Sequence, residues 1–234
     1  EEVQLQKTMF MPHGKNAIVV SYDVFNPHND KMSIRIFPLV SSRHFHSVID
    51  RDELGWEFVQ KSFERGVVVC PSVPLSTLII CSSEGQYFAG KGEWIKRVYF
   101  RVDGSRGESC RDDSFQPGLF EFNVGPEEKK RFSVVATGGK TEDEAKGVLS
   151  SIYTDINALR DQELKYRENL LAKFQERYRD IKMEDWLKWL VLATDSFIVS
   201  RESTKTKSVI AGYHWFEDWG RDSLISLPGL ILIT

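Results

Sequence analysis

Residues 16–25 read NAIVVSYDVF, a run of β-branched and aromatic side chains between two turn signals, Gly14 and Asn26-Pro27. Such runs favour β-strands. Similar runs recur before residue 140 with no helical pattern between them: residues 32–40, 66–70, 77–81, 94–102 and 131–136. The segments IRIF and VYFRV alternate apolar and polar side chains, which is typical of half-buried antiparallel strands. We therefore predict an antiparallel β-sandwich for residues 1–139.

The sequence becomes helical in period after residue 140, and Gly138-Gly139 marks a hinge. The segment Thr141-Glu-Asp-Glu144 is a capping box, in which Thr141 caps free N–H groups and Glu144 reaches back. Apolar residues then follow at helical spacing and form one stripe: Ala145, Val148, Leu149, Ile152, Ile156, Leu159, Leu170, Leu171, Phe174, Tyr178 and Ile181. This pattern predicts a long or kinked linker helix over residues 140–182.

Residues 183–234 form the third predicted segment. Residues 184–201 (EDWLKWLVLATDSFIVSR) are apolar around most of a helix, so we expect this helix to be buried on more than one side. Residues 208–220 break the helical period. A second apolar helix is expected from Asp222, with Pro228 near its first turn or at a kink. Because the chain starts without Met and stops inside an apolar run, we expect it to be a piece of a longer protein.

The overall composition is that of an ordinary soluble protein, with 41% hydrophobic and 28% charged residues and a net charge of −3. The chain has no excess of basic residues, so its charge does not favour nucleic acid or an anionic membrane as a partner. No apolar run is long enough to predict a transmembrane helix. Cys70, Cys81 and Cys110 show no CxxC spacing, which argues against a zinc site and fits a reducing, cytoplasmic location. A disulfide bond between Cys70 and Cys81, on neighbouring strands, is an alternative that the sequence leaves undecided.

The stretch that carries chemistry is residues 211–222, AGYHWFEDWGRD. Aromatic rings, including those of Tyr213, His214 and Trp215, offer flat faces for the C–H surface of a sugar. A neighbouring guanidinium and carboxylate, Arg221 and Asp222, can together grip adjacent hydroxyl groups. The alternative from composition alone is an Arg–Asp ion pair beneath an aromatic core.

This stretch begins a longer resemblance. The segment WFEDWGRDSLISLPGL (215–230) resembles the start of the catalytic domain in the archaeal and bacterial type of glycogen debranching enzyme, an amylo-α-1,6-glucosidase. The segments PHGKNAIVVSYDV (12–24), PLVSSRHFH (38–46) and GEWIKRVYFRVDGSRGESCRDDSFQPGLFEF (92–122) are similar to its N-terminal domain. The segment ATDSFIVSR (193–201) is similar to its first barrel helix.

The resemblance implies a supersandwich-like β domain followed by the first helices of an (α/α)6 barrel. It implies an exo-acting glycosidase that removes α-1,6-linked glucose from glycogen or a branched α-glucan with inversion, and no cofactor. The Trp-x-Arg-Asp element of such enzymes binds the sugar at the dead end of the pocket. Carried over, this assigns substrate binding to Trp219, Arg221 and Asp222, with Trp215 and Asp218 as neighbours.

No catalytic residue is expected in this chain. Inverting hydrolysis needs a carboxylic acid and a carboxylate roughly 6.5–9.5 Å apart, and in this architecture both come from later barrel helices. Glu217 and Asp218 precede the sugar-gripping element, and the resemblance gives them no such role. We therefore expect a missing C-terminal barrel segment, in cis or in trans, to supply them.

Two motifs in the β region leave alternatives open. Residues 43–46 read RHFH; on a strand, His44 and His46 would share a face that suits a metal, but no further ligand has supporting spacing, so no metal site is predicted. Under the resemblance this is a loop near the sugar pocket, where Arg43 or His46 contacts a branch. Residues 111–113 (RDD) fit a calcium site, a solvated loop or a pairing site for nearby arginines.

Three functions remain from the sequence. The first is the glycosidase piece just described. The second is a non-catalytic glucan-binding or assembly subunit, whose barrel another chain completes. The third is a cupin-like metal protein built on the HxH motif.

Overall fold

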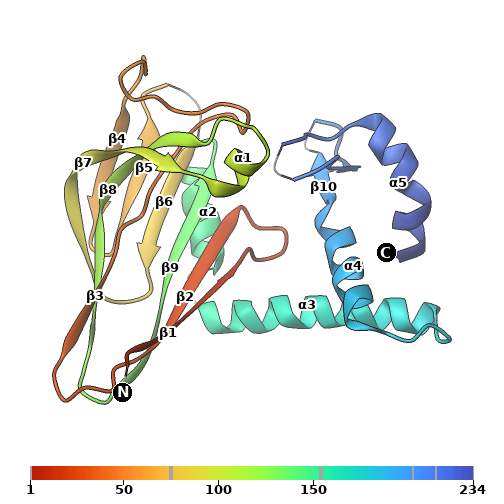
Figure 1. The fold of residues 1–234 in the computed structure, drawn as a ribbon, viewed down its shortest axis with the longest axis horizontal. Coiled ribbons are helices and arrows are strands. Elements are labelled where there is room, and N and C mark those ends of the chain that lie inside the picture. The colour runs from red at the N-terminus through yellow and green to blue at the C-terminus, as the bar shows by residue number, and fades with distance from the viewer. Residues whose placement is uncertain (1, 74–75, 153–154, 202, 214, 234) are drawn as a thin grey trace. The chain divides into compact units, whose positions relative to one another are not determined.

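The computed structural model describes residues 2–73, 76–152, 155–201, 203–213 and 215–233, and the side chains as far as residue 230. The described residues form two compact units, Glu1–Arg160 and Asp161–Thr234. The first unit holds two antiparallel sheets, and the second consists of helices and one short hairpin (Figure 1). Helix α3 (Ile156–Arg177) begins in the first unit and continues into the second.

The larger sheet of the first unit contains six strands in the described residues, in the order β1-β2-β9-β6-β5-β4. All neighbours run antiparallel. The strands are β1 (Gln4–Phe10), β2 (Ala17–Phe25), β9 (Lys129–Gly139), β6 (Thr77–Ser82), β5 (Gly66–Pro71) and β4 (Phe58–Phe63). Strand β9, the last in sequence, therefore lies in the middle of the sheet.

The second sheet has the order β3-β8-β7, from β3 (Met32–Ile36), β8 (Arg111–Val124) and β7 (Gln86–Tyr99). One core joins both sheets: Phe120 and Phe122 of β8 and Phe132 of β9 are fully buried in it. The rings of Phe122 and Phe132 stack with centroids 3.8 Å apart. The two sheets thus pack face to face, as the alternating strand pattern predicted.

Each of the six predicted runs contains a strand, but several boundaries were wrong, and β1, β4 and β8 lie outside the predicted runs. Strand β7 begins at Gln86, before the run 94–102. The run 94–102 ends as a strand at Tyr99, and the short helix α1 (Arg101–Ser105) follows. The run 32–40 ends as a strand at Ile36, because Pro38 lacks the N–H that a ladder needs. Val40 then forms an isolated bridge with Phe115.

Helix α2 (Glu142–Ile152) covers part of the outer face of the six-stranded sheet. The capping box is confirmed: the Glu144 N–H donates to Thr141 Oγ1 at 3.2 Å, and Glu144 Oε2 accepts from the Lys140 N–H at 2.8 Å. Ala145 and Ile152 are buried against the sheet. The predicted linker helix is thus two helices, α2 and α3, and α2 packs on the first unit.

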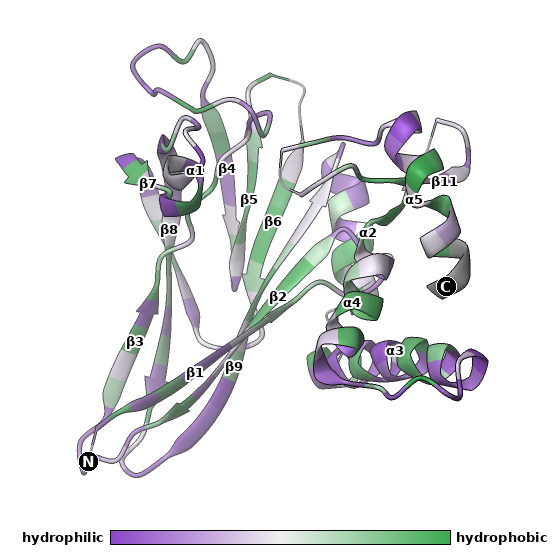
Figure 2. Ribbon diagram, turned by 45° about the vertical axis from the view of Figure 1, so that its right-hand side comes forward, coloured by the Kyte–Doolittle hydropathy of each residue, from purple (hydrophilic) through white to green (hydrophobic). Residues whose placement is uncertain are grey.

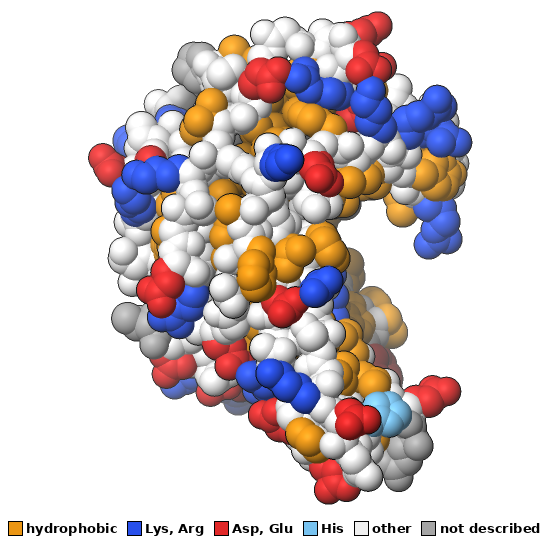
Figure 3. Space-filling view, turned by 90° about the vertical axis from the view of Figure 1, so that its left-hand side faces the viewer, with side chains coloured by type: hydrophobic (Ala, Val, Ile, Leu, Met, Phe, Trp, Pro, Cys, Tyr) orange, Lys and Arg blue, Asp and Glu red, His pale blue; other side chains and the backbone are white. Residues whose placement is uncertain are grey.

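The outer face of the three-stranded sheet mixes charged and apolar side chains. Arg35 of β3 and Glu121 of β8 form a cross-strand ion pair of 2.7 Å. Phe88 of β7 is exposed on the same face, opposite Leu119. Figure 3 looks at the side of the molecule where β7 lies and shows hydrophobic patches between charged groups.

The second unit contains the end of α3, helix α4 (Asp185–Ser196), the hairpin of β10 (Ile198–Arg201) and β11 (Thr206–Val209), and helix α5 (Gly220–Ile233). A small core joins α3 and α4, with Phe174, Leu187 and Val191 buried.

Two expectations for the second unit were wrong. The helix over 184–201 ends at Ser196, because β-branched Ile198 and Val199 enter a strand that pairs with β11. Trp186 and Trp189 are 66% and 68% exposed, so α4 is not buried on several sides in the described structure. For Pro228 the sequence left two alternatives; it lies inside α5 and not in its first turn, so the kink is the alternative that remains.

The three cysteines are free thiols. Cys81 pairs with Gly66 across β5 and β6, which puts Cys70 at the far end of β5 and excludes the bridge between them. Burial raises the pKa of the Cys81 thiol to about 12. Among the described helices, none is both long and apolar enough to cross a bilayer.

Candidate functional site

The segment that connects β11 to α5 folds back on itself. Ile210 and Asp218 form an antiparallel bridge, and the Ala211 N–H donates to the Glu217 carbonyl at 3.0 Å. Inside this closed loop the Phe216 N–H donates to the Gly212 carbonyl at 2.9 Å. The loop is thus closed by its own backbone, and α5 starts directly after it.

Asp218 ties this loop to the β10–β11 hairpin. Its carboxylate accepts a hydrogen bond from the side chain of Ser208 on β11 and forms an ion pair with Arg201 on β10. The Ser208 hydrogen bond and the Arg201 charge together hold the pKa of Asp218 below its ordinary value. The carboxylate is therefore engaged in holding the local fold.

A cavity of about 310 Å³ lies between the end of α4, the hairpin and α5. This volume falls at the small end of the roughly 300–1,000 Å³ typical of ligand sites. Its walls are mostly apolar with a few polar groups: Thr194, Phe197, Val209, Ile210, Ala211, Asp222, Ser226, Gly229 and Leu230. The α5 residues in this set follow helical spacing, so one face of α5 forms a wall.

Asp222 is the charged group at this cavity. Its side chain is 31% exposed, yet Oδ2 is buried and finds no hydrogen-bond partner among the described residues. The nearest cation, Arg221 Nε, is 3.7 Å away, beyond hydrogen-bond distance. A buried acceptor without a partner costs about 1–3 kcal/mol.

The other predicted sugar-binding residues lie near the cavity in sequence but do not line it. The side chain of Arg221 is 75% exposed and Trp219 is 54% exposed, while Trp215 is half-buried. Arg221 and Asp222 form an ion pair with 3.7 Å between Nε and Oδ2, but the exposed guanidinium does not lie beneath an aromatic core. His214 lies outside the described residues.

Several polar contacts near the cavity escaped the sequence analysis. Tyr166 of α3 donates to both carboxylate oxygens of Asp195 on α4, at 2.9 and 3.0 Å. Burial, together with this bond, raises the pKa of Tyr166 to about 12. Tyr213 donates to the Ser196 carbonyl at 2.9 Å. Among the cavity residues that the sequence analysis missed, Ser226 had a signal: it lies four residues, about one helical turn, after Asp222.

Arg43 and His46 lie in the first unit, on the loop between β3 and β4. Arg43 Nε donates to Asp112 Oδ2 at 2.6 Å, and its Nη1 donates to the carbonyls of His44 and Phe45. Asp112 also accepts from the Ile49 N–H at 2.6 Å. The guanidinium of Arg43 thus holds this loop on β8.

The HxH motif lies on this loop and not on a strand. The rings of His44 and His46 are 5.6 Å apart between centroids, with Phe45 stacked on His44. No group of three or more potential metal ligands occurs in the described part of the chain. His46 is exposed.

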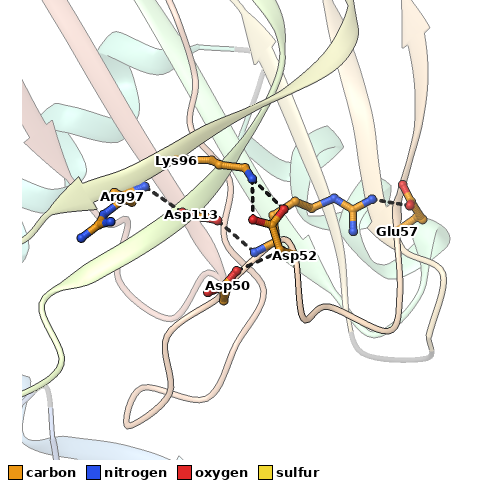
Figure 4. Close-up of polar contacts among 7 residues, drawn as sticks. Asp50, Asp52, Glu57, Lys96, Arg97 and Asp113 are labelled. Atoms are coloured by element: carbon orange, nitrogen blue, oxygen red, sulfur yellow. Dashed lines mark hydrogen bonds and ion pairs between the residues drawn. The ribbon is translucent and has the colours of Figure 1, made fainter.

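The paired aspartates after Arg111 are confirmed as a pairing site and are not a solvated loop, since both are buried. Asp113 Oδ1 accepts from the Arg97 N–H at 2.7 Å, and its Oδ2 accepts from the Arg51 N–H at 2.9 Å (Figure 4). Lys96 binds both oxygens of Asp52 at the same place. The network joins the loop before β4 to the irregular part of β7.

Two family models match this chain. Residues 1–131 match the model for the glycogen debranching enzyme N terminal, and residues 192–234 match the model for amylo-alpha-1,6-glucosidase. Both descriptions refer to glycoside hydrolases. Because the first match covers more than half of the chain, the chain belongs to the glycogen debranching enzyme family.

Solved structures with some similarity include a bacterial glucoamylase complexed with acarbose, at 13% identity and a TM-score of 0.37 over 73% of this chain. A putative kojibiose phosphorylase from the human microbiome is similar at 9% identity and a TM-score of 0.30 over 70% of this chain. The chain spans 26% of the glucoamylase and 18% of the phosphorylase. A comparison with curated proteins finds no match.

Proposed function

We propose that this chain is part of a cytoplasmic glycogen-debranching glycoside hydrolase, which removes α-1,6-linked glucose from glycogen or limit dextrin in glycogen catabolism. Residues 1–139 form its β-sandwich domain, 140–182 a helical linker, and 183–234 the start of an (α/α)6 barrel. The observation that carries the proposal is the partly exposed carboxylate of Asp222 in the wall of a cavity, within a segment that matches the amylo-alpha-1,6-glucosidase model.

The cavity binds one terminal glucose unit. The Asp222 carboxylate, whose side chain is 31% exposed, accepts a hydrogen bond from a sugar hydroxyl, and the apolar wall around Phe197 contacts the C–H face. Trp215, Trp219 and Arg221 form the rim that contacts the rest of the substrate. Asp218 supports the rim through Arg201 and does not touch the sugar.

The reaction proceeds with inversion, and the acid and base belong to a barrel segment in cis or in trans. Asp218 is a poor candidate for a general acid, because its lowered pKa keeps it ionised at neutral pH. Neither Asp218 nor Glu217 lines the cavity.

The test combines binding and hydrolysis. The purified chain should bind isomaltose by ligand-observed NMR, and Asp222→Asn should weaken this binding about tenfold, as expected for one lost charged hydrogen bond. Glu217→Gln serves as the matched control, since it also neutralises a carboxylate, but one outside the cavity lining.

Glucose release from an α-1,6-branched limit dextrin provides the second measurement. We expect no release by the chain alone. Release that disappears in Glu217→Gln or Asp218→Asn would show that a catalytic carboxylate lies within these residues, and the assignment of acid and base would be wrong.

A further inference from the structure

A second concave site lies entirely within the first unit, on strands β1, β2 and β9. It has a volume of about 450 Å³, within the roughly 300–1,000 Å³ of typical ligand sites. The three strands run side by side in Figures 1 and 2, and their polar stretches appear purple in Figure 2. We call this site the β1–β2–β9 groove. Its lining is Gln4, Leu5, Gln6, Asp23, Val24, Phe25, Lys129, Lys130 and Arg131.

The strand register shows which face of the sheet carries the groove. Cross-strand partners form two rows, Gln6–Asp23–Arg131 and Gln4–Phe25–Lys129. Side chains two residues apart share a face, so both rows lie on the face that α2 covers further along the strands, at Val19 and Val135. The row between them, Leu5–Val24–Lys130, also belongs to the lining, although its side chains start on the opposite face of the sheet.

The first row places opposite polar groups next to each other. Arg131 Nε and Asp23 Oδ1 are 2.5 Å apart, and their side chains remain 45% and 32% exposed. The amide of Gln6 stands beside them on the edge strand. A carboxylate, a guanidinium and an amide together offer acceptors and donors for the hydroxyl groups of a sugar.

The second row supplies an aromatic surface. Phe25 is half-buried, and Lys129 Nζ lies 5.5 Å from the centroid of its ring. Gln4 flanks it on β1. Two of the three cations in the lining are already paired, Arg131 with Asp23 and Lys130 with Glu84, so the groove favours an uncharged ligand over an anion.

We propose that the β1–β2–β9 groove binds a neutral α-glucan chain as an accessory site of the first unit. The identity of the glucan rests on the proposed function, whereas the groove shares no residue with the Asp222 cavity. The groove holds glycogen by its linear outer chains, and the cavity binds the terminal glucose.

Affinity electrophoresis of the full chain in gels that contain glycogen tests the proposal. Arg131→Ala and Gln6→Ala should each weaken retardation about tenfold, and maltoheptaose should compete with glycogen. Arg35→Ala is the matched control, because Arg35 also pairs across strands, with Glu121, but on the other sheet. Gln6 is exposed on the edge strand, so Gln6→Ala keeps the test valid should Arg131→Ala disturb folding.

Three outcomes would overturn the accessory site: no retardation of the wild-type chain, equal retardation of wild type and both groove variants, or displacement by inorganic phosphate but not by maltoheptaose. The proposed function fails separately, through unchanged isomaltose binding in Asp222→Asn. Loss of glycogen retardation in the groove variants with normal isomaltose binding would support both sites.

Discussion

Arg43 Nε lies 2.6 Å from Asp112 Oδ2, and the side chain of Asp112 is completely buried. The Ile49 N–H is a second donor to the same carboxylate. The pair therefore joins a long surface loop to a central strand of the smaller sheet. Arg43 therefore helps to hold this loop on β8, and its contact with substrate stays a prediction.

Removing this arginine should destabilise the first unit. Arg43→Ala leaves a buried carboxylate with a lost ion partner, and we expect a loss near the lower end of about 3–5 kcal/mol. Urea denaturation of the full chain measures this change. The neighbouring exposed residue gives the control: His46→Ala should change stability by less than about 0.5 kcal/mol. If Arg43→Ala weakens glucan binding and leaves stability unchanged, Arg43 contacts the substrate and does not stabilise the fold.

Asp113 should contribute to acid sensitivity. Burial opposes its ionisation, but hydrogen bonds from the Arg51 and Arg97 N–H groups outweigh burial, and the pKa of Asp113 falls below its ordinary value. A carboxylate with a lowered folded-state pKa adds stability above its unfolded pKa of about 3.9 and loses it as the pH falls further. The urea midpoint should therefore fall less steeply below about pH 4 in Asp113→Asn than in wild type. Parallel curves would contradict this role.

Replacing Asp222 should abolish isomaltose binding without lowering the stability of the fold. Its buried Oδ2 lacks a hydrogen-bond partner among the described residues, and its ion pair with the exposed Arg221 is long, so Asp222→Ala should leave the thermal midpoint unchanged or raise it, while isomaltose binding is lost. A clear drop in the midpoint would mean that Asp222 holds the fold, and the cavity would lose its proposed ligand contact. Ser226→Ala, in the same wall, should affect binding less.

Tyr166 should make the second unit sensitive to alkali. Its folded-state pKa of about 12 exceeds the ordinary value of 10.0, so its contribution is complete below pH 10 and is lost as the pH rises towards 12. Tyr166→Phe removes the bonds to Asp195 and should cost about 1.5–3 kcal/mol at neutral pH. Tyrosinate absorbance during a pH titration should show one late-ionising tyrosine fewer in the variant. An unchanged titration would exclude the bond.

The end of the first unit can be located by truncation. Ala145 and Ile152 of α2 are buried on the outer face of the six-stranded sheet, and Thr137 donates to the Ala145 carbonyl at 3.0 Å. A chain that ends at Arg160 should be monodisperse, whereas one that ends at Gly139 exposes this apolar face and should aggregate. Light scattering distinguishes the two. A monodisperse shorter chain would show that the sheet does not need α2.

The sequence predicted the strands best where the local signal was strong. The run from residue 16 became β2, and the Thr141 capping box starts α2, because propensity and capping act over a few residues. Residues 198–201 look helical from their apolar period, yet they form β10 because Thr206–Val209 pairs with them. The spacing of apolar residues within 198–201 carries no information about their pairing with a segment that comes later in the chain.

The candidate site was predicted only in part, for a related reason. The stretch 211–222 was recognised from its aromatic and charged residues, but the tie from Asp218 to Arg201 spans 17 residues and has no local signature. Asp112 likewise reaches Arg43 across 69 residues. Sequence showed which groups could do chemistry, whereas packing decided which of them hold the fold.

Strand β9 has a consequence for how the protein is made. It lies between β2 and β6, so the two halves of the larger sheet meet only through residues 129–139 in the described structure. During synthesis, the edges of β2 and β6 that pair with β9 therefore stay unpaired until residues 129–139 have left the ribosome. Formation of the first unit should be a late and slow event during synthesis, because its central pairings are distant in sequence.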